Sequence, residues 1–290
     1  MHLNTNHIPA TIELAPKQAI ESEDLPGLLP PGVRVYITDL GNDDLEETVA
    51  AARRVRDLGY EPVPHVAARR VTSADALERR MERLTGEAGV RDVLVIGGGL
   101  DSPAGPFDST MALLETGVME RHGIAHLGVA GHPEGSPDFS AGAALDALRL
   151  KTAFGTRTGI EVRIVTQFGF DPLAMIAWLR ELRSHGVDLP VHIGVAGPAT
   201  LKTLLRYAAF CGVGASMSFL KRNAMKITAL ATTQSPEEVV GPLERHWRDG
   251  GDTPLVGMHV FPFGGLVKSA TWLHERGSWS DVALPDAATG

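Results

Sequence analysis

The stretch Val165-Thr166-Gln167-Phe168-Gly169-Phe170-Asp171-Pro172 ends a short apolar run and opens a helical pattern. Short apolar runs rich in Val predict buried strands, and Asp-Pro is a common start signal for a helix. One long amide, Gln167, stands among the apolar residues at the end of this run. Its side chain offers a donor and an acceptor together, which suits the pyrimidine-like edge of a pterin or flavin.

The same alternation of strand and helix recurs along the chain, and it predicts parallel strands joined by crossover helices. The eight expected strands are Thr11–Leu14, Val33–Thr38, Pro62–Val66, Asp92–Gly97, Ala125–Ala130, Val162–Phe168, Pro190–Val195 and Leu255–Phe261. No compositional linker separates the units. We therefore expect a single-domain (β/α)8 TIM barrel over residues 1–290, with short tails at about 1–8 and 280–290.

Helix signals fill the segments between these strands. Start signals and terminal glycines predict the helices Leu45–Leu58, Ala76–Leu84 and Leu173–Ser184. After the seventh strand, two helices are expected at about Ala199–Tyr207 and Pro236–Asp249, with a shorter helical piece within Gly212–Thr233. Each expected helix thus follows a strand.

Composition excludes several classes of protein. The chain is 43% hydrophobic and 21% charged, which is globular, and its net charge of -8 argues against nucleic acid or an anionic membrane as the main partner. The single cysteine, Cys211, excludes an internal disulfide and a cysteine-cluster metal site. Since no apolar run is long enough to span a bilayer and no signal peptide is recognisable, we expect a cytoplasmic location.

In a TIM barrel, active residues lie at the carboxyl ends of strands and in the loops that follow. Glu13 lies among apolar residues on the first strand, where desolvation would raise its pKa and let it deliver a proton near neutrality. The alternative is a Glu paired with a structural cation.

Each of the other candidate residues can be explained either by a function or by a structural role. Gly97-Gly98-Gly99 would let a ligand approach the backbone, or is simply a tight turn, and it does not match a dinucleotide fingerprint. Asp101 faces the site or caps this turn. Lys151 reaches a phosphate from the end of a helix or is a solvated lysine. Four histidines lie near strands without a metal-binding pair, so we expect no metal: His65, His132, His192 and His259.

The order of these elements resembles the methylenetetrahydrofolate reductase family over about residues 10 to 275. The motifs that carry the resemblance are Glu13 in Ile-Glu-Leu-Ala-Pro-Lys, a Thr ending strand two, Pro64-His65, the glycines after strand four, His132-Pro133-Glu134, Leu150-Lys151 and Val-Thr-Gln-Phe-Gly-Phe-Asp. Of these, the Glu13 strand and the Thr166-Gln167-Phe168 strand end are the most specific.

The resemblance implies a flavin-bearing barrel that passes a hydride from NADH or NADPH through FAD to 5,10-methylenetetrahydrofolate, giving 5-methyltetrahydrofolate. It makes Glu13 the residue that assists ring opening, and Gln167 and Tyr207 the residues that contact the folate. FAD contacts would come from Thr38, His65, Gly98, Phe107 and Lys151. The family also leads us to expect a homo-oligomer.

This chain departs from the family pattern at positions expected to meet the cofactor. Gly97-Gly98-Gly99 replaces an Arg-Gly-Asp run, so Asp101 is the nearest substitute, and Ala144 and Ala147 replace an Asp and an Asn. After strand eight, Phe261-Pro262-Phe263-Gly264-Gly265 stands where an arginine is usual. Two alternatives therefore stay open: a flavin-independent tetrahydrofolate-dependent methyl- or aminomethyl-transfer barrel, and a noncatalytic folate-binding subunit.

Overall fold

The computed structural model describes residues 6–41, 44–136, 138–210 and 233–279. Eight strands form a closed barrel in the order β1, β10, β7, β6, β5, β4, β3, β2, which confirms the predicted (β/α)8 fold. The strands are β1 (Ala10–Leu14), β2 (Arg34–Ile37), β3 (Glu61–Ala67), β4 (Asp92–Ile96), β5 (His126–Gly131), β6 (Glu161–Phe168), β7 (Val191–Ala196) and β10 (Leu255–Phe261). Each lies within one residue of its predicted bounds, because Val- and Ile-rich runs mark buried strands clearly.

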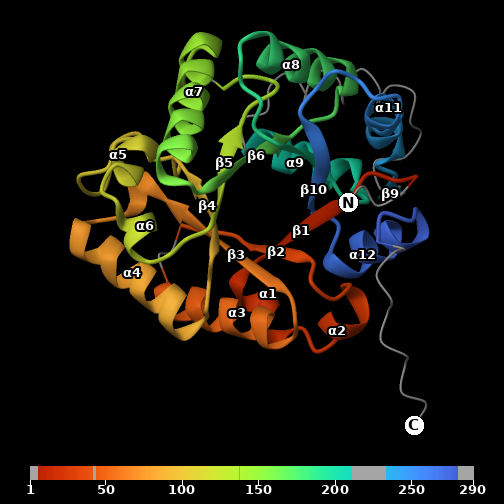
Figure 1. Cartoon of the computed structure of the whole chain (residues 1–290). Coiled ribbons are helices and arrows are strands. Elements are labelled where there is room, and N and C mark those ends of the chain that lie inside the picture. The colour runs from red at the N-terminus through yellow and green to blue at the C-terminus, as the bar shows by residue number, and fades with distance from the viewer. Residues whose placement is uncertain (1–5, 42–43, 137, 211–232, 280–290) are drawn as a thin grey trace. The chain divides into compact units, whose positions relative to one another are not determined.

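Helices connect the strands (Figure 1). They are α1 (Pro16–Glu21), α2 (Leu25–Leu28), α3 (Leu45–Asp57), the 3-10 turn η1 (Ala68–Arg70), α4 (Ala74–Glu87), α5 (Thr110–Leu114), α6 (Val118–Arg121), α7 (Ala141–Thr158), α8 (Pro172–Ser184), α9 (Leu201–Phe210), α11 (Glu237–Arg248) and α12 (Leu266–Glu275). Among the described helices, none has both the length and the apolar character needed to cross a membrane.

Side-chain caps explain where three of the long helices begin. Asp44 accepts a hydrogen bond from the Glu47 N–H at the start of α3, and the Ser73 hydroxyl accepts one from the Ala76 N–H at the start of α4. Asp171 accepts hydrogen bonds from two N–H groups at the start of α8, where Pro172 is the first helical residue. Such caps satisfy backbone donors that have no partner inside the helix.

Two segments differ from the sequence-based expectation. The helix that carries Lys151 continues to Thr158, so Lys151 lies within α7 and not at its end; Gly159, with φ of 76°, follows the last helical residue. Ala199–Thr200, predicted as the start of a helix, forms β8, which pairs antiparallel with β9 (Thr233–Gln234) before α9 begins. Cys211 and almost all of the helical piece predicted within Gly212–Thr233 lie outside the described residues.

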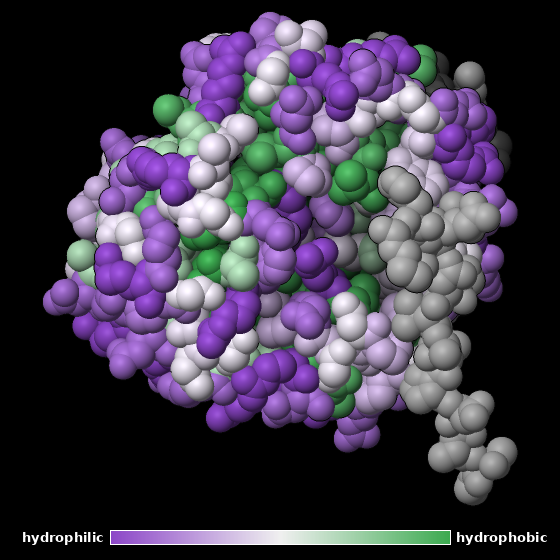
Figure 2. Space-filling model, viewed as in Figure 1, coloured by the Kyte–Doolittle hydropathy of each residue, from purple (hydrophilic) through white to green (hydrophobic). Residues whose placement is uncertain are grey.

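Contacts group the chain into two compact units. The second unit comprises Glu13–Ala130 and Leu150–Arg163, and the first comprises the rest of the described chain. Within the second unit, α3 and α4 lie side by side and show a largely hydrophilic surface (Figures 1 and 2). There Arg83 forms ion pairs with Glu46 and Glu87.

A buried polar cluster lies inside the second unit. The Arg163 guanidinium donates hydrogen bonds to the Tyr36 hydroxyl at 2.8 and 3.0 Å and pairs with Asp92 at 2.9 Å. Arg34 pairs with the other oxygen of the same carboxylate at 3.1 Å. Burial raises the pKa of Tyr36, although the positive charge of Arg163 opposes this effect. The buried side chains of Tyr36, Asp92 and Arg163 therefore join β2, β4 and β6.

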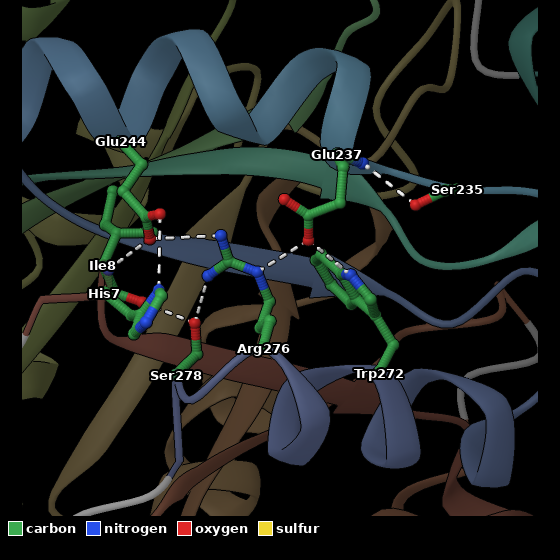
Figure 3. A network of polar contacts seen from close by, with 8 residues as sticks. All are labelled: His7, Ile8, Ser235, Glu237, Glu244, Trp272, Arg276 and Ser278. Atoms are coloured by element: carbon green, nitrogen blue, oxygen red, sulfur yellow. Dashed lines mark hydrogen bonds and ion pairs between the residues drawn. The ribbon is translucent and has the colours of Figure 1, made fainter.

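In the first unit, one arginine joins the N-terminal segment to two helices (Figure 3). Arg276 pairs with Glu237 at 3.0 Å and with Glu244 at 3.1 Å, and both carboxylates belong to α11. Glu244 also accepts a hydrogen bond from the N–H of Ile8, a residue at the edge of the predicted N-terminal tail that is only 1% exposed. The chain just before β1 is therefore fixed to α11 and to the end of α12.

We expect Arg163→Met to destabilise the protein by about 3–5 kcal/mol, because it leaves the Asp92 carboxylate buried without its closest cation. Urea unfolding monitored by circular dichroism measures this change. Arg157→Met is the matched control, since Arg157 makes an exposed ion pair with Glu115 and its loss should cost about 1 kcal/mol or less. Equal effects of the two substitutions would contradict a stabilising role for the buried cluster.

Candidate active site

Glu13 and His65 form a buried acid–imidazole pair at the carboxyl ends of β1 and β3. The Glu13 carboxylate lies 4.0 Å from Nε2 of His65, and the two side chains are 12% and 8% exposed. Burial raises the pKa of Glu13 from 4.5 to about 7, and the nearby His65 partly opposes this rise. The Tyr36 ring meets the His65 ring edge-on, with centroids 6.3 Å apart. Glu13 can therefore hold or release a proton near neutral pH, as the sequence suggested.

Thr38 lies next to this pair. Its N–H and its hydroxyl both donate hydrogen bonds to the carbonyl of Leu14, at 3.0 and 3.2 Å, so the first residue after β2 is fixed to the end of β1. The hydroxyl oxygen can still accept a hydrogen bond. A narrow cavity beside these residues is lined by Thr38, His65, Asp39 and Arg80, among others.

The glycine loop after β4 folds back onto η1. Gly98 has φ of 105°, and an added Cβ there would lie 3.1 Å from the Ala67 Cβ, so only glycine fits without strain. The Gly97 carbonyl accepts a hydrogen bond from the Arg69 N–H, and the Gly98 carbonyl accepts one from the Arg70 guanidinium. The loop is therefore a fixed turn whose bare backbone stays accessible beside Ala67, the last residue of β3.

Lys151 is another buried ionisable group of the second unit. Its side chain is 6% exposed, and burial lowers the pKa of its ammonium to about 8. In the described part of the chain its ammonium makes no hydrogen bond or ion pair. A buried cation without an anionic partner is costly, so an anionic ligand at this position would stabilise the charged form.

Phe107 and Asp101 have opposite surroundings. Phe107 is 5% exposed and belongs to the core. Asp101 is exposed, and its carbonyl accepts a hydrogen bond from Arg69 at 2.7 Å. That the Asp101 side chain faces the site and contacts the substrate, in place of the Asp of the family's Arg-Gly-Asp run, stays a prediction.

Gln167 lies at a bulge in β6, in the first unit. The β6–β7 register shifts between Val165 and Phe168, and the Gly194 N–H of β7 donates to the Thr166 hydroxyl at 2.7 Å. The Gln167 side-chain oxygen accepts a hydrogen bond from the N–H of Phe168 at 3.2 Å. Bulges are common next to active sites, where they redirect a side chain. In the part of the chain that the structure describes, the amide nitrogen of Gln167 makes no hydrogen bond, so it can donate one to a ligand.

Tyr207 belongs to an aromatic cluster in the first unit. Its ring stacks on Phe263 with centroids 4.0 Å apart and planes 13° apart, and Phe263 in turn meets Phe168 edge-on at 4.8 Å. Tyr207 and Phe263 are partly buried against an apolar core that includes Phe168 and Phe170. The arrangement leaves an aromatic surface that suits a planar ligand ring.

The predicted site residues divide between the two units. Seven of them fall in the second unit: Glu13, Thr38, His65, Gly98, Asp101, Phe107 and Lys151. Gln167 and Tyr207 fall in the first unit. Ala144 and Ala147 lie in α7, and their side chains offer no polar group to a ligand.

Three further residues were assigned no role from the sequence, although two of them, Glu134 and Phe263, lie in motifs that follow strands five and eight. Glu134 accepts a hydrogen bond from the Phe170 N–H at 3.2 Å, which fixes the loop after β6. Phe263 stacks on Tyr207, and Arg70 contacts the glycine loop. Each contacts a partner distant in sequence, so the sequence marked the loops of Glu134 and Phe263 as candidates but did not reveal these contacts.

Neither a metal site nor a second surface cavity adds to the candidate site. Among the described residues, no group of three His, Cys, Asp or Glu side chains could hold a metal ion. A surface cavity of about 490 Å³ is lined by Arg180, Arg183, Ser184, His246, Gly251 and Asp252. It lies at the C-terminal ends of α8 and α11, where basic residues balance the helix dipoles, and no candidate residue lines it.

Comparisons with known proteins give a partial similarity. No protein-family model matches the chain. Methylenetetrahydrofolate reductase 1 of Schizosaccharomyces pombe is 33% identical over 95 residues, which are 32% of this chain and 15% of the yeast protein. The similarity thus spans a small part of that enzyme.

Solved structures share the general architecture only at a distance. An intracellular xylanase from Thermoanaerobacterium saccharolyticum has 10% identity and a TM-score of 0.48, covering 89% of this chain and 86% of its own. The carboxyl transferase domain of Rhizobium etli pyruvate carboxylase has 12% identity and a TM-score of 0.45, covering 98% of this chain and 50% of its own. Neither likeness bears on the activity of this chain.

We expect the stability of the protein to fall as the pH rises from about 4.5 to 7. In this range native Glu13 keeps a proton that the unfolded chain has released, so the unfolded state gains relative stability until the pH passes the folded-state pKa. The loss is up to about 3 kcal/mol. Urea unfolding of wild type and of Glu13→Gln at several pH values gives the free energy of unfolding of each protein as a function of pH. The difference between these two free energies measures the loss. Glu21→Gln, at an exposed position on α1, should run parallel to wild type. A pH-independent difference between wild type and Glu13→Gln would contradict the raised pKa.

Proposed function

We propose that the chain is a methylenetetrahydrofolate reductase-like enzyme of one-carbon metabolism. The observation that carries this proposal is the buried Glu13 carboxyl beside His65, with its pKa raised to about 7. The partial similarity to the yeast reductase supports it independently. Gln167 and Tyr207, whose side chains suit a polar heterocycle and an aromatic ring, would contact the folate.

Glu13 would act as the acid that opens the five-membered ring of 5,10-methylenetetrahydrofolate. The bond between N10 and the methylene carbon breaks with its electron pair going to N10, and N10 takes the proton of Glu13, directly or through a water molecule. The methylene carbon is left double-bonded to N5 as an electrophilic iminium. His65, 4.0 Å away, would stabilise the carboxylate that remains on Glu13.

The second unit offers groups that fit a phosphate-bearing cofactor such as FAD. Lys151 is a buried cation suited to an anion, Gly98 keeps its backbone bare, and Thr38 can accept a hydrogen bond. Together with His65 and Phe107 they would hold the cofactor. Bound FAD would supply the hydride, taken from NADH or NADPH, that completes 5-methyltetrahydrofolate.

The second candidate function is a flavin-independent, tetrahydrofolate-dependent methyl- or aminomethyl-transfer enzyme. It is favoured by the apolar Ala144 and Ala147 on α7 and by the uncharged Gly97–Gly99 turn. In this alternative Glu13 and Gln167 would still bind the reduced folate. The two functions differ in whether flavin is retained.

We expect Glu13→Gln to lower folate turnover by about 100-fold or more, because an amide cannot donate the proton that N10 requires. Oxidation of NADH or NADPH by an artificial electron acceptor should continue, since it needs no proton from Glu13. Steady-state assays of both reactions measure the split, with Glu21→Gln as the control variant at an exposed carboxylate. Loss of both reactions would assign Glu13 a structural role.

The flavin part has its own test. Purified protein should show the visible absorbance of bound FAD, or retain added FAD through gel filtration. A titration with tetrahydrofolate in the absence of flavin, run beside it, identifies the second candidate. Protein that binds tetrahydrofolate but retains no FAD and oxidises no nicotinamide would overturn the reductase proposal in favour of group transfer.

A further inference from the structure

Arg70 lies where the loops after three strands meet. It is the last residue of η1, the short turn directly after β3, and its side chain is partly buried. Its Nε donates a 2.8 Å hydrogen bond to the carbonyl of Gly98, in the loop after β4. An added Cβ at Gly98 would also come within 3.4 Å of the Arg70 Cγ. The Arg70 side chain thus runs along the glycine loop.

The far end of the same side chain reaches the loop after β2. An added Cβ at Gly41, where φ is 82°, would collide with Nη1 of Arg70, so the guanidinium lies directly against a backbone that has no side chain. The Gly41 N–H donates to the Asp39 carboxylate at 2.7 Å, which satisfies this backbone group locally. Two glycines, on two different loops, therefore make the space that the guanidinium occupies.

Most of the hydrogen-bonding capacity of this guanidinium is unused. In the described part of the chain it makes one hydrogen bond, to Gly98, and no ion pair. A guanidinium has five N–H donors, and the two terminal nitrogens of Arg70 keep theirs. The planar fork of such donors matches phosphate oxygens two at a time.

The neighbouring Arg69 has a structural role, in contrast to Arg70. Its backbone N–H donates to the Gly97 carbonyl, and its guanidinium donates to the Asp101 carbonyl at 2.7 Å. Its own carbonyl accepts a hydrogen bond from the Ala104 N–H. Arg69 thus fastens the glycine loop at three points, so the loop does not depend on Arg70 alone for its shape.

We propose that Arg70 is an anion-binding residue that takes a phosphate or pyrophosphate group of a nucleotide at the carboxyl ends of β2, β3 and β4. The two glycines position the cation. Thr38 directly follows β2, and His65 lies two residues before the end of β3. The identity of the nucleotide, a flavin or a nicotinamide one, rests on the proposed function. The anion site itself does not.

Binding of inorganic pyrophosphate, measured by isothermal titration calorimetry at low salt, tests the site. Arg70→Gln should weaken pyrophosphate binding about tenfold or more, since the fork is lost. Arg70→Lys should be intermediate, because it keeps the charge without the planar donors. Arg69→Gln is the matched control and should stay close to wild type. Far-UV circular dichroism checks that each variant is folded.

Three further probes separate the sources of the phosphate. FAD and NADH carry phosphates and riboflavin does not, so Arg70→Gln should weaken the phosphate-bearing ligand that wild type binds and leave riboflavin binding unchanged. Equal pyrophosphate affinity in wild type and Arg70→Gln, equal losses in Arg69→Gln and Arg70→Gln, or no pyrophosphate binding by wild type would each overturn the proposal. Pyrophosphate binding through Arg70 without flavin retention or folate turnover would instead uphold the anion site and reject the reductase.

Discussion

The parallel pairing of β2, β3 and β4 is the constraint on which the candidate site depends. Ile37 of β2 pairs with Pro64 of β3, and Ala67 of β3 pairs with Ile96 of β4. The carboxyl ends of the three strands therefore lie side by side. Thr38, His65 and the glycine loop lie at these ends. Groups that are 28 or more residues apart along the chain, such as Arg70 and Gly98, become hydrogen-bonding partners. Without this register, neither the Glu13–His65 pair nor the Arg70 guanidinium would lie beside the residues that now contact it.

Burial then determines the pKa values of two ionisable side chains in the second unit. Glu13 and Lys151 carry opposite charges in the ionised state, yet the same desolvation moves the pKa of each toward neutrality. Both side chains thus exchange protons at a pH close to that of a cell. Poor access to water also strengthens any charge–charge contact that a ligand makes there, which suits the recognition of an anion.

Local pattern predicted the strands well, because each is a short apolar run with clear neighbours, and Leu255–Phe261 was predicted exactly at both ends. It failed where structure depends on a distant partner. The bulge at Gln167 requires Gly194 on the next strand, β8 requires Thr233–Gln234, and the Tyr207–Phe263 stack joins segments 56 residues apart. Glu13 was predictable as a buried acid, whereas its pairing with His65 appears only once β1 and β3 are in place.

The contacts of β1 have a consequence for the order of folding. Ala10, Thr11 and Ile12 pair with Met258, His259 and Val260, and the Trp279 side chain donates to the Ala10 carbonyl across 269 residues of sequence. During synthesis the first strand leaves the ribosome long before its partner exists. Closure of the sheet must therefore wait for nearly the last residue of β10, and a loop of this size closes slowly. Until then the backbone N–H and C=O groups on one edge of β1 are unpaired. The nascent chain must therefore be kept from pairing with other exposed strands, which would cause aggregation.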